Sequence, residues 1–444
     1  MHSGTHWKLN MTDNQILALQ PDHIAELQQR YQRALAGHGY SALLISAGAS
    51  PMRYGDDQGA PFQGFGPFLH WTGLTGYEHA WLLIQADTTP VLWLYQPVDF
   101  WHAILQLPSE PWQQAMDIRY ITKRGLPPLP AETSQGHGMA VVGDPAQLMD
   151  VPGDHNPAAL TVALDETRMH KTDYEVACLT RANNIALAGH QAAAAAFAQG
   201  ASEFAINLAY QQATLQRETD APYHSIIGLN EHAGTLHYQY YDTRAPAQSR
   251  SLLMDAGVRY RGYCSDITRT YAAAGEGRFA ALVKGMDLLR ERLCKMVAPG
   301  VEYLAIHRKA HSGVAALLSA SGLVSGISDE AMVEQGITRA FFPHGIGHFL
   351  GIQVHDVAGK PVPSPAEAPF LRLTRTLEAG MVVTIEPGLY FIPSLLEPLL
   401  KGPLAQHINT AILDELKGCG GVRLEDNVLV TEAGARNLSR LTEN

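Results

Sequence analysis

The chain has 444 residues, of which 46% are hydrophobic and 17% charged, a composition typical of a globular protein with a large core. Its formal net charge is −11 at neutral pH, and no block of Lys and Arg stands out, so we expect no nucleic-acid partner. No run of about 18 apolar residues occurs and the N-terminus lacks a signal-peptide pattern, so we expect no membrane partner and a cytoplasmic location.

The first part of the chain predicts a small α/β domain. Its apolar runs and one amphipathic stretch predict a helix over 22–37 that ends at Gly37, a buried strand over 41–45 and strands over 79–85 and 90–95. Residues 50–70 are rich in Gly, Pro and aromatic side chains, which indicates a long loop. Residues 125–137 are rich in Pro and Gly and should be irregular. We expect no regular structure in Met1–Asn10, which shows no periodicity.

A long helix opens the second part of the chain. Thr172 and Glu175 have the spacing of a capping box, and the alanine-rich residues 176–198 continue the helix. After it, paired strand-like stretches alternate with helical ones, which indicates an α+β arrangement. We therefore expect two domains, an N-terminal α/β domain over 11–165 and a C-terminal domain over 166–444.

Five polar residues of the C-terminal domain stand in local patterns that would hold a side chain still, such as strand ends and a glycine-rich motif. They are Asp255, Asp266, His348, Glu386 and Glu425. Taken singly, each carboxylate would be an ordinary turn or strand-end residue, but Asp255 and Asp266 together can converge from adjacent strands. Four carboxylates and one imidazole form a hard, oxygen-rich set that suits paired Mn²⁺-like ions better than a structural zinc. Four negative charges also balance two divalent cations.

Other kinds of metal site fit the sequence less well. His344 and His348 have the i, i+4 spacing of a zincin helix, but the glutamate of that motif is missing, and Gly345 and Gly347 oppose a helix. We expect these glycines instead to allow close approach of the backbone to a metal or a substrate. The four cysteines show no paired spacing and are expected to be small, buried apolar residues.

Four motifs follow one another in the C-terminal domain. They are Asp255-Ala256-Gly257 through Asp266-Ile267-Thr268-Arg269, His344-Gly345-Ile346-Gly347-His348, Glu386-Pro387-Gly388, and Arg423-Leu424-Glu425-Asp426. The order of these motifs and their residue types resemble those of the pita-bread metallopeptidases. This family includes methionine aminopeptidase, aminopeptidase P and the Xaa-Pro dipeptidases (prolidases). The resemblance to bacterial prolidases extends over nearly the whole chain after Met11. It implies a pita-bread (creatinase/aminopeptidase-like) catalytic domain and two divalent metal ions per subunit, expected to be Mn²⁺, on the five ligands.

The resemblance also implies roles for residues around the metals. A hydroxide held between the ions would attack the scissile carbonyl, and Glu386 would shuttle a proton to the leaving nitrogen. Apart from the resemblance, Arg423 lies two residues before Glu425 on the same predicted strand, so the two side chains should share a face, and Arg423 would form an ion pair that orients the Glu425 carboxylate. The remaining matches are His237 near the scissile bond, His355 facing the substrate, and Tyr223 and His344 in the pocket wall. Without the resemblance, a lone histidine would be a structural residue.

Substrate length would depend on one arginine. Arg372, in Leu371-Arg372-Leu373-Thr374-Arg375, looks like the prolidase arginine that binds the substrate carboxylate, and its bidentate guanidinium would favour a dipeptide. In the N-terminal domain, Asp57 and Trp101 match positions that reach the partner subunit's site in bacterial prolidases, which implies a homodimer. Without the resemblance, Asp57 would be an ordinary loop acid.

We therefore expect a Xaa-Pro dipeptidase whose substrate is a dipeptide with a C-terminal proline. An aminopeptidase P-like activity is the alternative, and Arg372 separates the two by limiting substrate length. A methionine aminopeptidase needs no large N-terminal domain, creatinase shares the fold without metals, and a non-catalytic peptide-binding relative would have lost ligands. Some prolidases also hydrolyse organophosphorus esters, a side activity compatible with a metal-held hydroxide.

Overall fold

The computed structural model describes residues 11–133, 136, 138–273 and 277–440. These residues divide into two compact units: the first ends at Arg181 and also contains Tyr260–Tyr263, and the second contains the rest. The elements are mixed α and β, as the sequence predicts. The domain limit predicted at residue 165 stays a prediction, and Met1–Asn10 lies outside the described residues.

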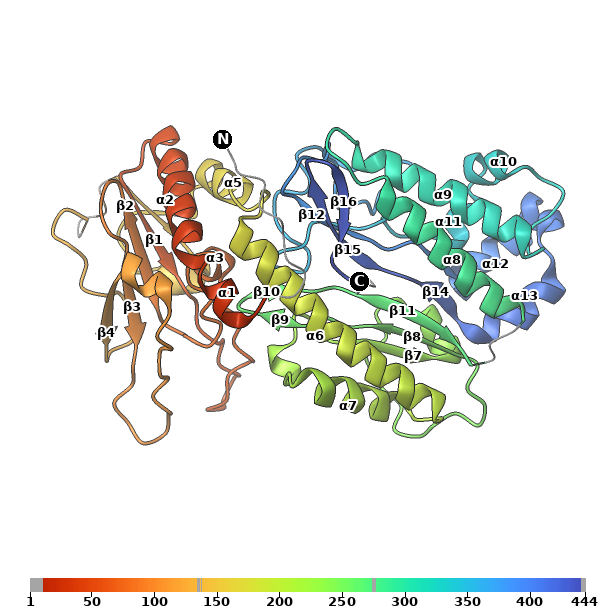
Figure 1. The fold of residues 1–444 in the computed structure, drawn as a ribbon, viewed down its shortest axis with the longest axis horizontal. Helices are drawn as coiled ribbons and strands as arrows, with labels where there is room; N and C mark the ends of the chain where they lie inside the picture. Colours follow the sequence, from red (N-terminus) through yellow and green to blue (C-terminus); the bar gives the residue numbers. More distant parts are fainter. Residues whose placement is uncertain (1–10, 134–135, 137, 274–276, 441–444) are drawn as a thin grey trace. The chain divides into compact units, whose positions relative to one another are not determined.

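The first unit contains a six-stranded sheet of order β4-β3-β2-β1-β5-β6 (Figure 1). Its strands are β1 (Ala42–Ser46), β2 (Trp81–Gln85), β3 (Val91–Tyr95), β4 (Asp117–Ile121), β5 (Met139–Val142) and β6 (Asp154–His155). β1 pairs antiparallel with β2 and parallel with β5, and all of its residues are buried, which explains its unbroken apolar run. The strands predicted over 41–45, 79–85 and 90–95 are confirmed as β1, β2 and β3.

The helices of the first unit lie before, between and after these strands along the chain. They are α1 (Asp13–Leu17), α2 (Gln20–Gly37), α3 (Gly66–Thr72), α4 (Pro145–Leu148) and α5 (Ala158–Glu166), with a 3₁₀ turn η1 (Pro111–Ala115). α2 ends at Gly37 as predicted. Its buried face includes Ile24, Leu27 and Tyr31, which recur at helical spacing.

The loop prediction for residues 50–70 is wrong from residue 66 onward, where α3 begins. Pro67 stands in the first turn of α3, a position that needs no backbone N–H, and Phe68 and Trp71 are buried. Burial of these side chains stabilises a helix in a stretch whose Gly and Pro content favours a loop. The described part of residues 125–137 contains neither helix nor strand, as predicted.

The capping box predicted at Thr172 is confirmed. The backbone N–H of Glu175 donates to Thr172 Oγ1 (3.4 Å), and the N–H of Thr172 donates to Glu175 Oε2 (2.9 Å). It opens α6 (Asp173–Ala198), which is followed by α7 (Glu203–Thr214). Both helices cover one face of the sheet β11-β8-β7 (Figure 1), where small side chains such as Ala186 and Ala193 pack against the strands.

The second unit is built from small antiparallel sheets. Their strands are β7 (Ile226–Leu229), β8 (Ser251–Asp255), β9 (Arg259–Tyr260), β10 (Tyr263–Cys264), β11 (Thr268–Ala272), β12 (Val382–Ile385), β13 (Gly388–Tyr390), β14 (Gly421–Arg423), β15 (Asp426–Thr431) and β16 (Gly434–Asn437). The later helices are α8 (Arg278–Lys295), α9 (Tyr303–Ala320), α10 (Asp329–Glu334), α11 (Ile337–Phe341), α12 (Pro393–Lys401) and α13 (Thr410–Leu416). α8 packs against strands of both the β11-β8-β7 and the β12-β15-β16 sheets.

Two breaks in neighbouring strands face each other in the second unit. β12 pairs with β15 up to Ile385 opposite Asp426, and β13 pairs with β14 from Gly388 opposite Arg423. Pro387, which cannot donate a ladder hydrogen bond, lies in the first break. The N–H of Leu424 in the second break donates to the Pro387 carbonyl (3.3 Å). The prediction that Arg423 and Glu425 share one strand is therefore wrong, because β14 ends at Arg423 and β15 begins after Glu425.

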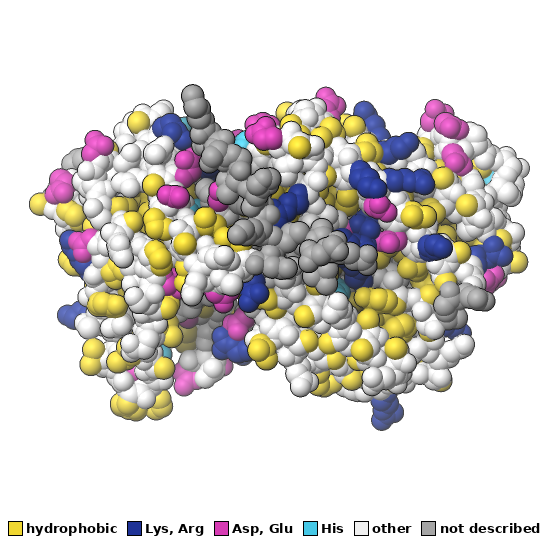
Figure 2. All heavy atoms as spheres, in the orientation of Figure 1, with side chains coloured by type: hydrophobic (Ala, Val, Ile, Leu, Met, Phe, Trp, Pro, Cys, Tyr) yellow, Lys and Arg dark blue, Asp and Glu magenta, His cyan; other side chains and the backbone are white. Residues whose placement is uncertain are grey.

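Several broader expectations can be compared with the structure. All four cysteines are described and buried, and no two are joined by a disulfide. Within the described ranges, no helix is both long and apolar enough to span a membrane. On the face shown in Figure 2, Lys and Arg side chains are interspersed with Asp and Glu.

Candidate active site

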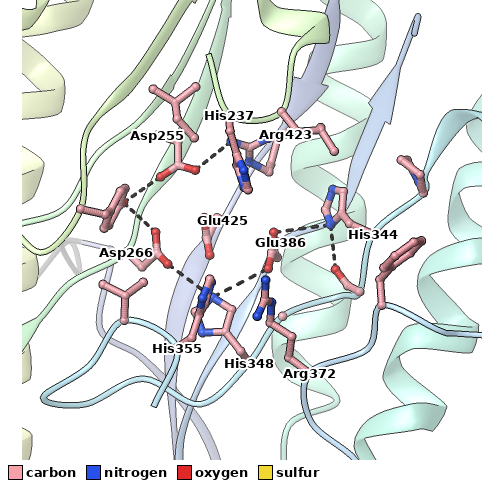
Figure 3. Close-up of a pocket in the computed structure, with 18 of the residues that line it drawn as sticks. His237, Asp255, Asp266, His344, His348, His355, Arg372, Glu386, Arg423 and Glu425 are labelled. Carbon is pink, nitrogen blue, oxygen red and sulfur yellow. Dashed lines mark hydrogen bonds and ion pairs between the residues drawn. The ribbon is translucent and has the colours of Figure 1, made fainter. Parts of the chain in front are cut away.

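A cavity of about 960 Å³ lies within the second unit. Its lining contains all five predicted metal ligands and five of the predicted substrate or catalytic residues, as well as Arg423 (Figure 3). The predicted ligands are Asp255, Asp266, His348, Glu386 and Glu425, and the others are Tyr223, His237, His344, His355 and Arg372. Segments far apart in the sequence thus contribute to one cavity.

One aspartate ends a strand, and the other lies just before the strand that pairs with it. Asp255 ends β8 opposite Thr268, the first residue of β11, and Asp266 lies two residues before Thr268. Asn427 holds the backbone of Asp266, since the Asp266 N–H donates to Asn427 Oδ1 (3.0 Å) and Asn427 Nδ2 donates to the Asp266 carbonyl (2.5 Å). The Tyr223 hydroxyl lies 2.7 Å from Asp255 Oδ1 and 2.7 Å from Asp266 Oδ1. Its single proton can be donated to only one carboxylate at a time.

His348 presents its Nε2 atom to the carboxylates. Nδ1 donates to the Phe349 carbonyl (2.9 Å), which leaves Nε2 without a proton in the neutral ring. Nε2 lies 3.4 Å from Asp266 Oδ2 and 3.9 Å from Glu386 Oε1. This tautomer is the one needed for a metal ligand.

Gly347 is required for the position of His348. The backbone of Gly347 has φ +149°, and a Cβ atom there would overlap the Thr384 carbonyl oxygen of β12 and the Tyr303 hydroxyl. The His348 N–H donates to Thr384 Oγ1 (3.2 Å). The glycine therefore allows close approach to a strand, whereas we expected close approach to a metal or a substrate.

We predict that Gly347→Ala lowers stability by about 1–3 kcal/mol, as other overpacked sites do, and displaces His348 from the ligand group. Metal content by elemental analysis and the midpoint of thermal unfolding would both fall. Gly37→Ala is the matched control, because a Cβ at Gly37 meets nothing within 4 Å. Normal metal content in purified Gly347→Ala would contradict the prediction.

The two glutamates lie in the facing strand breaks. Glu386 stands between β12 and β13, and Glu425 stands between β14 and β15. Their backbones are tied to other elements, because the Glu386 N–H donates to the Ile346 carbonyl (2.9 Å) and the Glu425 N–H donates to the Thr268 carbonyl (3.0 Å). The Thr268 hydroxyl also donates to Glu425 Oε2 (2.8 Å).

The carboxylates repel one another in the absence of cations. Burial, and then the charge of Asp266, raises the pKa of Asp255. Burial also raises the pKa of Glu425 well above its ordinary value and raises the pKa of Glu386 to about 7, with nearby carboxylates adding to both shifts. Asp266 differs: burial would raise its pKa, but the contacts with His348 and Tyr223 and the nearby His355 together lower it. Such a group of carboxylates is stabilised by positive charge.

The donor set fits divalent cations. Asp266, His348 and Glu425 are all buried, and each offers a ligand atom within 4.8 Å of the other two. Asp255 is linked to Asp266 through the Tyr223 hydroxyl. Carboxylate oxygens around one imidazole are ligands that hard divalent ions prefer.

Arg423 is connected to His344 through Tyr390, a residue that sequence reasoning missed. Arg423 Nη2 donates to Asp255 Oδ2 (2.7 Å), not to Glu425 as predicted, and Nη1 donates to the Tyr390 hydroxyl (3.0 Å). The Tyr390 hydroxyl donates in turn to His344 Nε2 (2.8 Å). Burial, and then the charge of Arg423, lowers the pKa of His344 to about 3, so the ring is neutral.

The neutral His344 ring also faces Glu386. Its Nδ1 donates to the Gly345 carbonyl (2.8 Å) and lies 3.5 Å from Glu386 Oε2. Strand alternation could have pointed to Tyr390, because it lies on the face of Gly388 in the Glu386-Pro387-Gly388 motif.

The remaining lining residues are exposed to the cavity. The His355 ring contacts His348 edge-on (centroids 4.3 Å apart), and burial, and then the charge of His348, lowers its pKa to about 3. His237 points into the cavity (Figure 3). Arg372 makes no ion pair with any carboxylate that the structure describes, nor does Lys360, a further cation of the lining besides Arg372 and Arg423. Sequence reasoning missed Lys360, because a single lysine in a Gly-Lys-Pro stretch carries no signal.

Asp57 and Trp101 belong to the first unit. Asp57 lies in an exposed loop, and Trp101 is 78% exposed beside Phe100, whose ring centroid is 4.6 Å away. Their predicted place near the site of a partner subunit stays a prediction.

Both the N-terminal and the C-terminal part of the chain are similar in sequence to known proteins. The model of metallopeptidase family M24 matches residues 177–432, and the model of the Xaa-Pro dipeptidase N-terminal domain matches residues 18–165. A Xaa-Pro dipeptidase from Marinobacter nauticus is 70% identical over 98% of this chain and 100% of its own length. A Xaa-Pro dipeptidase from Cronobacter sakazakii is 44% identical over 96% of this chain and 98% of its own.

Solved structures of similar fold agree with the architecture. The low-pH form of Escherichia coli aminopeptidase P aligns with a TM-score of 0.71 at 24% identity, over 94% of each chain. Proline aminopeptidase P II from Yersinia pestis aligns with a TM-score of 0.69 at 23% identity, over 94% of this chain and 96% of its own. At these identities the likeness shows the fold alone.

Proposed function

Because the chain belongs to metallopeptidase family M24 and to its Xaa-Pro dipeptidases, we propose that it hydrolyses dipeptides with a C-terminal proline at the cavity of the second unit. The observation that carries the proposal is the convergence of four carboxylates and one imidazole in a cavity that also contains Arg372, which has no ion-pair partner among the described residues. The carboxylates suit metal ions, and the arginine suits the free carboxylate of a short peptide.

We propose that two divalent cations bind to Asp255, Asp266, His348, Glu386 and Glu425, with Asp266, His348 and Glu425 around one of them. Mn²⁺ is the ion that we favour, since the donors are hard and only one nitrogen is present. When bound, such cations lower the pKa of a water and polarise a carbonyl. Elemental analysis of the purified protein tests both the number and the identity of the ions.

The protein's own residues then bind the substrate and move a proton. Glu386 accepts a proton at a carboxylate oxygen and passes it to the proline nitrogen as the peptide bond breaks. His344 Nδ1, 3.5 Å from Glu386 Oε2, helps to keep that carboxylate in place. His237 and His355 line the space for the peptide, and Arg423 holds Asp255 through a 2.7 Å ion pair.

Arg372 binds the carboxylate of the substrate's proline in this proposal. Its guanidinium is exposed to the cavity and has no ion-pair partner in the part of the chain that the structure describes. A planar guanidinium can bind both oxygens of a carboxylate. A peptide that continues beyond proline would lack this charge at the right distance, so Arg372 would restrict the substrate to a dipeptide.

We predict that Arg372→Ala raises KM for Xaa-Pro by about 10- to 150-fold, because a charge-assisted hydrogen bond contributes about 1.5–3 kcal/mol. Amidated Xaa-Pro-NH₂, which lacks the carboxylate, should lose little. Arg372→Lys should restore only part of the binding, since an ammonium cannot reproduce the planar fork. The measurement is kcat/KM for both substrates in wild type and variants.

The same panel distinguishes the alternative activity. If wild type cleaves Xaa-Pro-Yaa tripeptides as well as Xaa-Pro, an aminopeptidase P-like activity replaces our proposal. If Arg372→Ala lowers kcat/KM equally for both substrates, Arg372 is a structural residue.

We also propose a homodimer in which Asp57 and Trp101 reach the partner's site. Trp101 and Phe100 are 78% and 87% exposed, and adjacent exposed aromatic side chains are typical of contact surfaces. A monomeric mass by sedimentation would overturn this proposal. The cytoplasmic location and the hydrolysis of organophosphorus esters stay predictions.

A further inference from the structure

A buried glutamate stands behind the segment that carries His237. Glu203 is the first residue of α7 and is only 1% exposed. The segment Leu229–Asp242 leaves β7, passes through a 3₁₀ turn and supplies Leu236, His237 and Gln239 to the cavity.

The Glu203 carboxylate bonds to this segment at its beginning, middle and end. Oε1 accepts the backbone N–H of Leu229 (2.8 Å) and lies 2.8 Å from His232 Nδ1. Oε2 accepts the backbone N–H of Asp242 (2.7 Å). A carboxylate can only accept, so His232 must carry its proton on Nδ1. One side chain thus brings residues 229 and 242 together and closes the segment into a loop.

The contacts beyond Glu203 extend toward His237. The His232 ring stacks on the ring of Tyr238 (centroids 4.4 Å apart, planes at 22°), and Tyr238 is only 7% exposed. Tyr238 is the immediate neighbour of His237 in the chain. A path of direct contacts therefore runs from the Glu203 carboxylate through His232 and Tyr238 to the backbone that carries His237.

Two other readings of Glu203 fit the contacts less well. Glu203, His232 and Asp242 have ligand atoms within 4.8 Å of one another, but both oxygens of Glu203 already accept hydrogen bonds from N–H groups, which a metal ligand would have to give up. Glu203 is also not needed merely to hold the start of the segment in place. Asn230 already does so, since its side chain accepts the Arg250 N–H (2.7 Å) and donates to the Gln248 carbonyl (2.8 Å).

We propose that Glu203 is a positioning residue that sets His237 in the cavity by closing the Leu229–Asp242 segment. The proposal rests on the proposed function, from which the role of His237 is taken. A buried carboxylate suits this task, since three N–H donors satisfy its charge and charge-assisted bonds are the strong ones. None of the five proposed metal ligands lies on this segment, so Glu203 should affect substrate turnover without affecting metal content.

The test uses Glu203→Gln, which keeps the size of the side chain. A glutamine has one acceptor oxygen, and its amide would face an N–H donor, so one end of the segment is released. Hydrogen exchange of residues 235–241 should become faster, and metal content should not change. We expect kcat/KM for Xaa-Pro to fall about tenfold or more, in line with the loss of a charge-assisted bond.

A double-mutant cycle with His237→Ala distinguishes positioning from general stability. If Glu203 acts through His237, Glu203→Gln lowers kcat/KM in the wild-type background and has little further effect beside His237→Ala. His232→Ala, which removes only the middle contact, should give a smaller change in the same direction. Glu231→Gln is the matched control, because Glu231 is an exposed acid of the same segment.

The outcomes separate this inference from the proposed function. Equal loss of kcat/KM in both backgrounds, or unchanged hydrogen exchange at residues 235–241, would overturn the role of Glu203. Wild-type protein that contains its metals but does not cleave Xaa-Pro would overturn the proposed function instead, and hydrogen exchange would still decide whether Glu203 positions the segment.

Discussion

Replacement of Glu386 by Gln is expected to lower kcat for Xaa-Pro dipeptides by about 10²- to 10⁴-fold, the usual contribution of a positioned acid or base. The amide cannot carry a proton to the proline nitrogen, and it removes one of the four charges that balance two divalent cations. Metal content should therefore fall as well. Single-turnover kinetics at saturating metal would separate the loss of proton transfer from the loss of metal.

The metal-free protein provides a control for folding. Burial raises the pKa of Glu386 to about 7, so its charge opposes folding above that pH when no cation is present. Metal-free Glu386→Gln should then be at least as stable at pH 8 as metal-free wild type. Glu432→Gln, at an exposed position, should change neither activity nor metal content. Full activity of Glu386→Gln with normal metal content would rule out the assignment of Glu386.

Removal of the metals is expected to abolish hydrolysis, and Mn²⁺ or Co²⁺ should restore more activity than Ca²⁺. Ca²⁺ takes six to eight oxygen ligands at longer distances and is a weaker Lewis acid, whereas the smaller ions suit a compact site with one imidazole. Binding should also raise the free energy of unfolding, by about 2.7 kcal/mol at a free ion concentration 100 times Kd.

The measurements are activity and thermal unfolding after chelation and after addition of each ion. Ca²⁺ that restores both activity and stability as well as Mn²⁺ would contradict a role for the ions in activating water. Activity that survives chelation, with no metal found by elemental analysis, would contradict the two-cation site as a whole.

The sequence by itself determined features that depend on near neighbours along the chain. The capping box of Thr172 and Glu175 closes over three residues, and the end of α2 is closed by hydrogen bonds from the N–H groups of Gly39 and Tyr40, within five residues, so both depend on near neighbours. The five candidate ligands could be named because they stand in four short motifs whose order along the chain resembles that of a known family. Their residue types alone indicate hard cations.

Only the tertiary structure decided how these side chains meet. Glu386 and Glu425 face each other because two strand breaks are in register, with the Leu424 N–H bonded to the Pro387 carbonyl. The ion-pair partner of Arg423 is Asp255. Glu425 is not the partner, because β14 ends at Arg423 and Glu425 lies outside that strand.

The roles inferred for Tyr390 and Glu203 likewise come from hydrogen bonds to residues distant in the sequence. A local pattern specifies which way a side chain points from its own element, but not which other element packs against it. That choice depends on strand pairing and burial over the whole unit, which is why the contacts of the site emerged only from the fold.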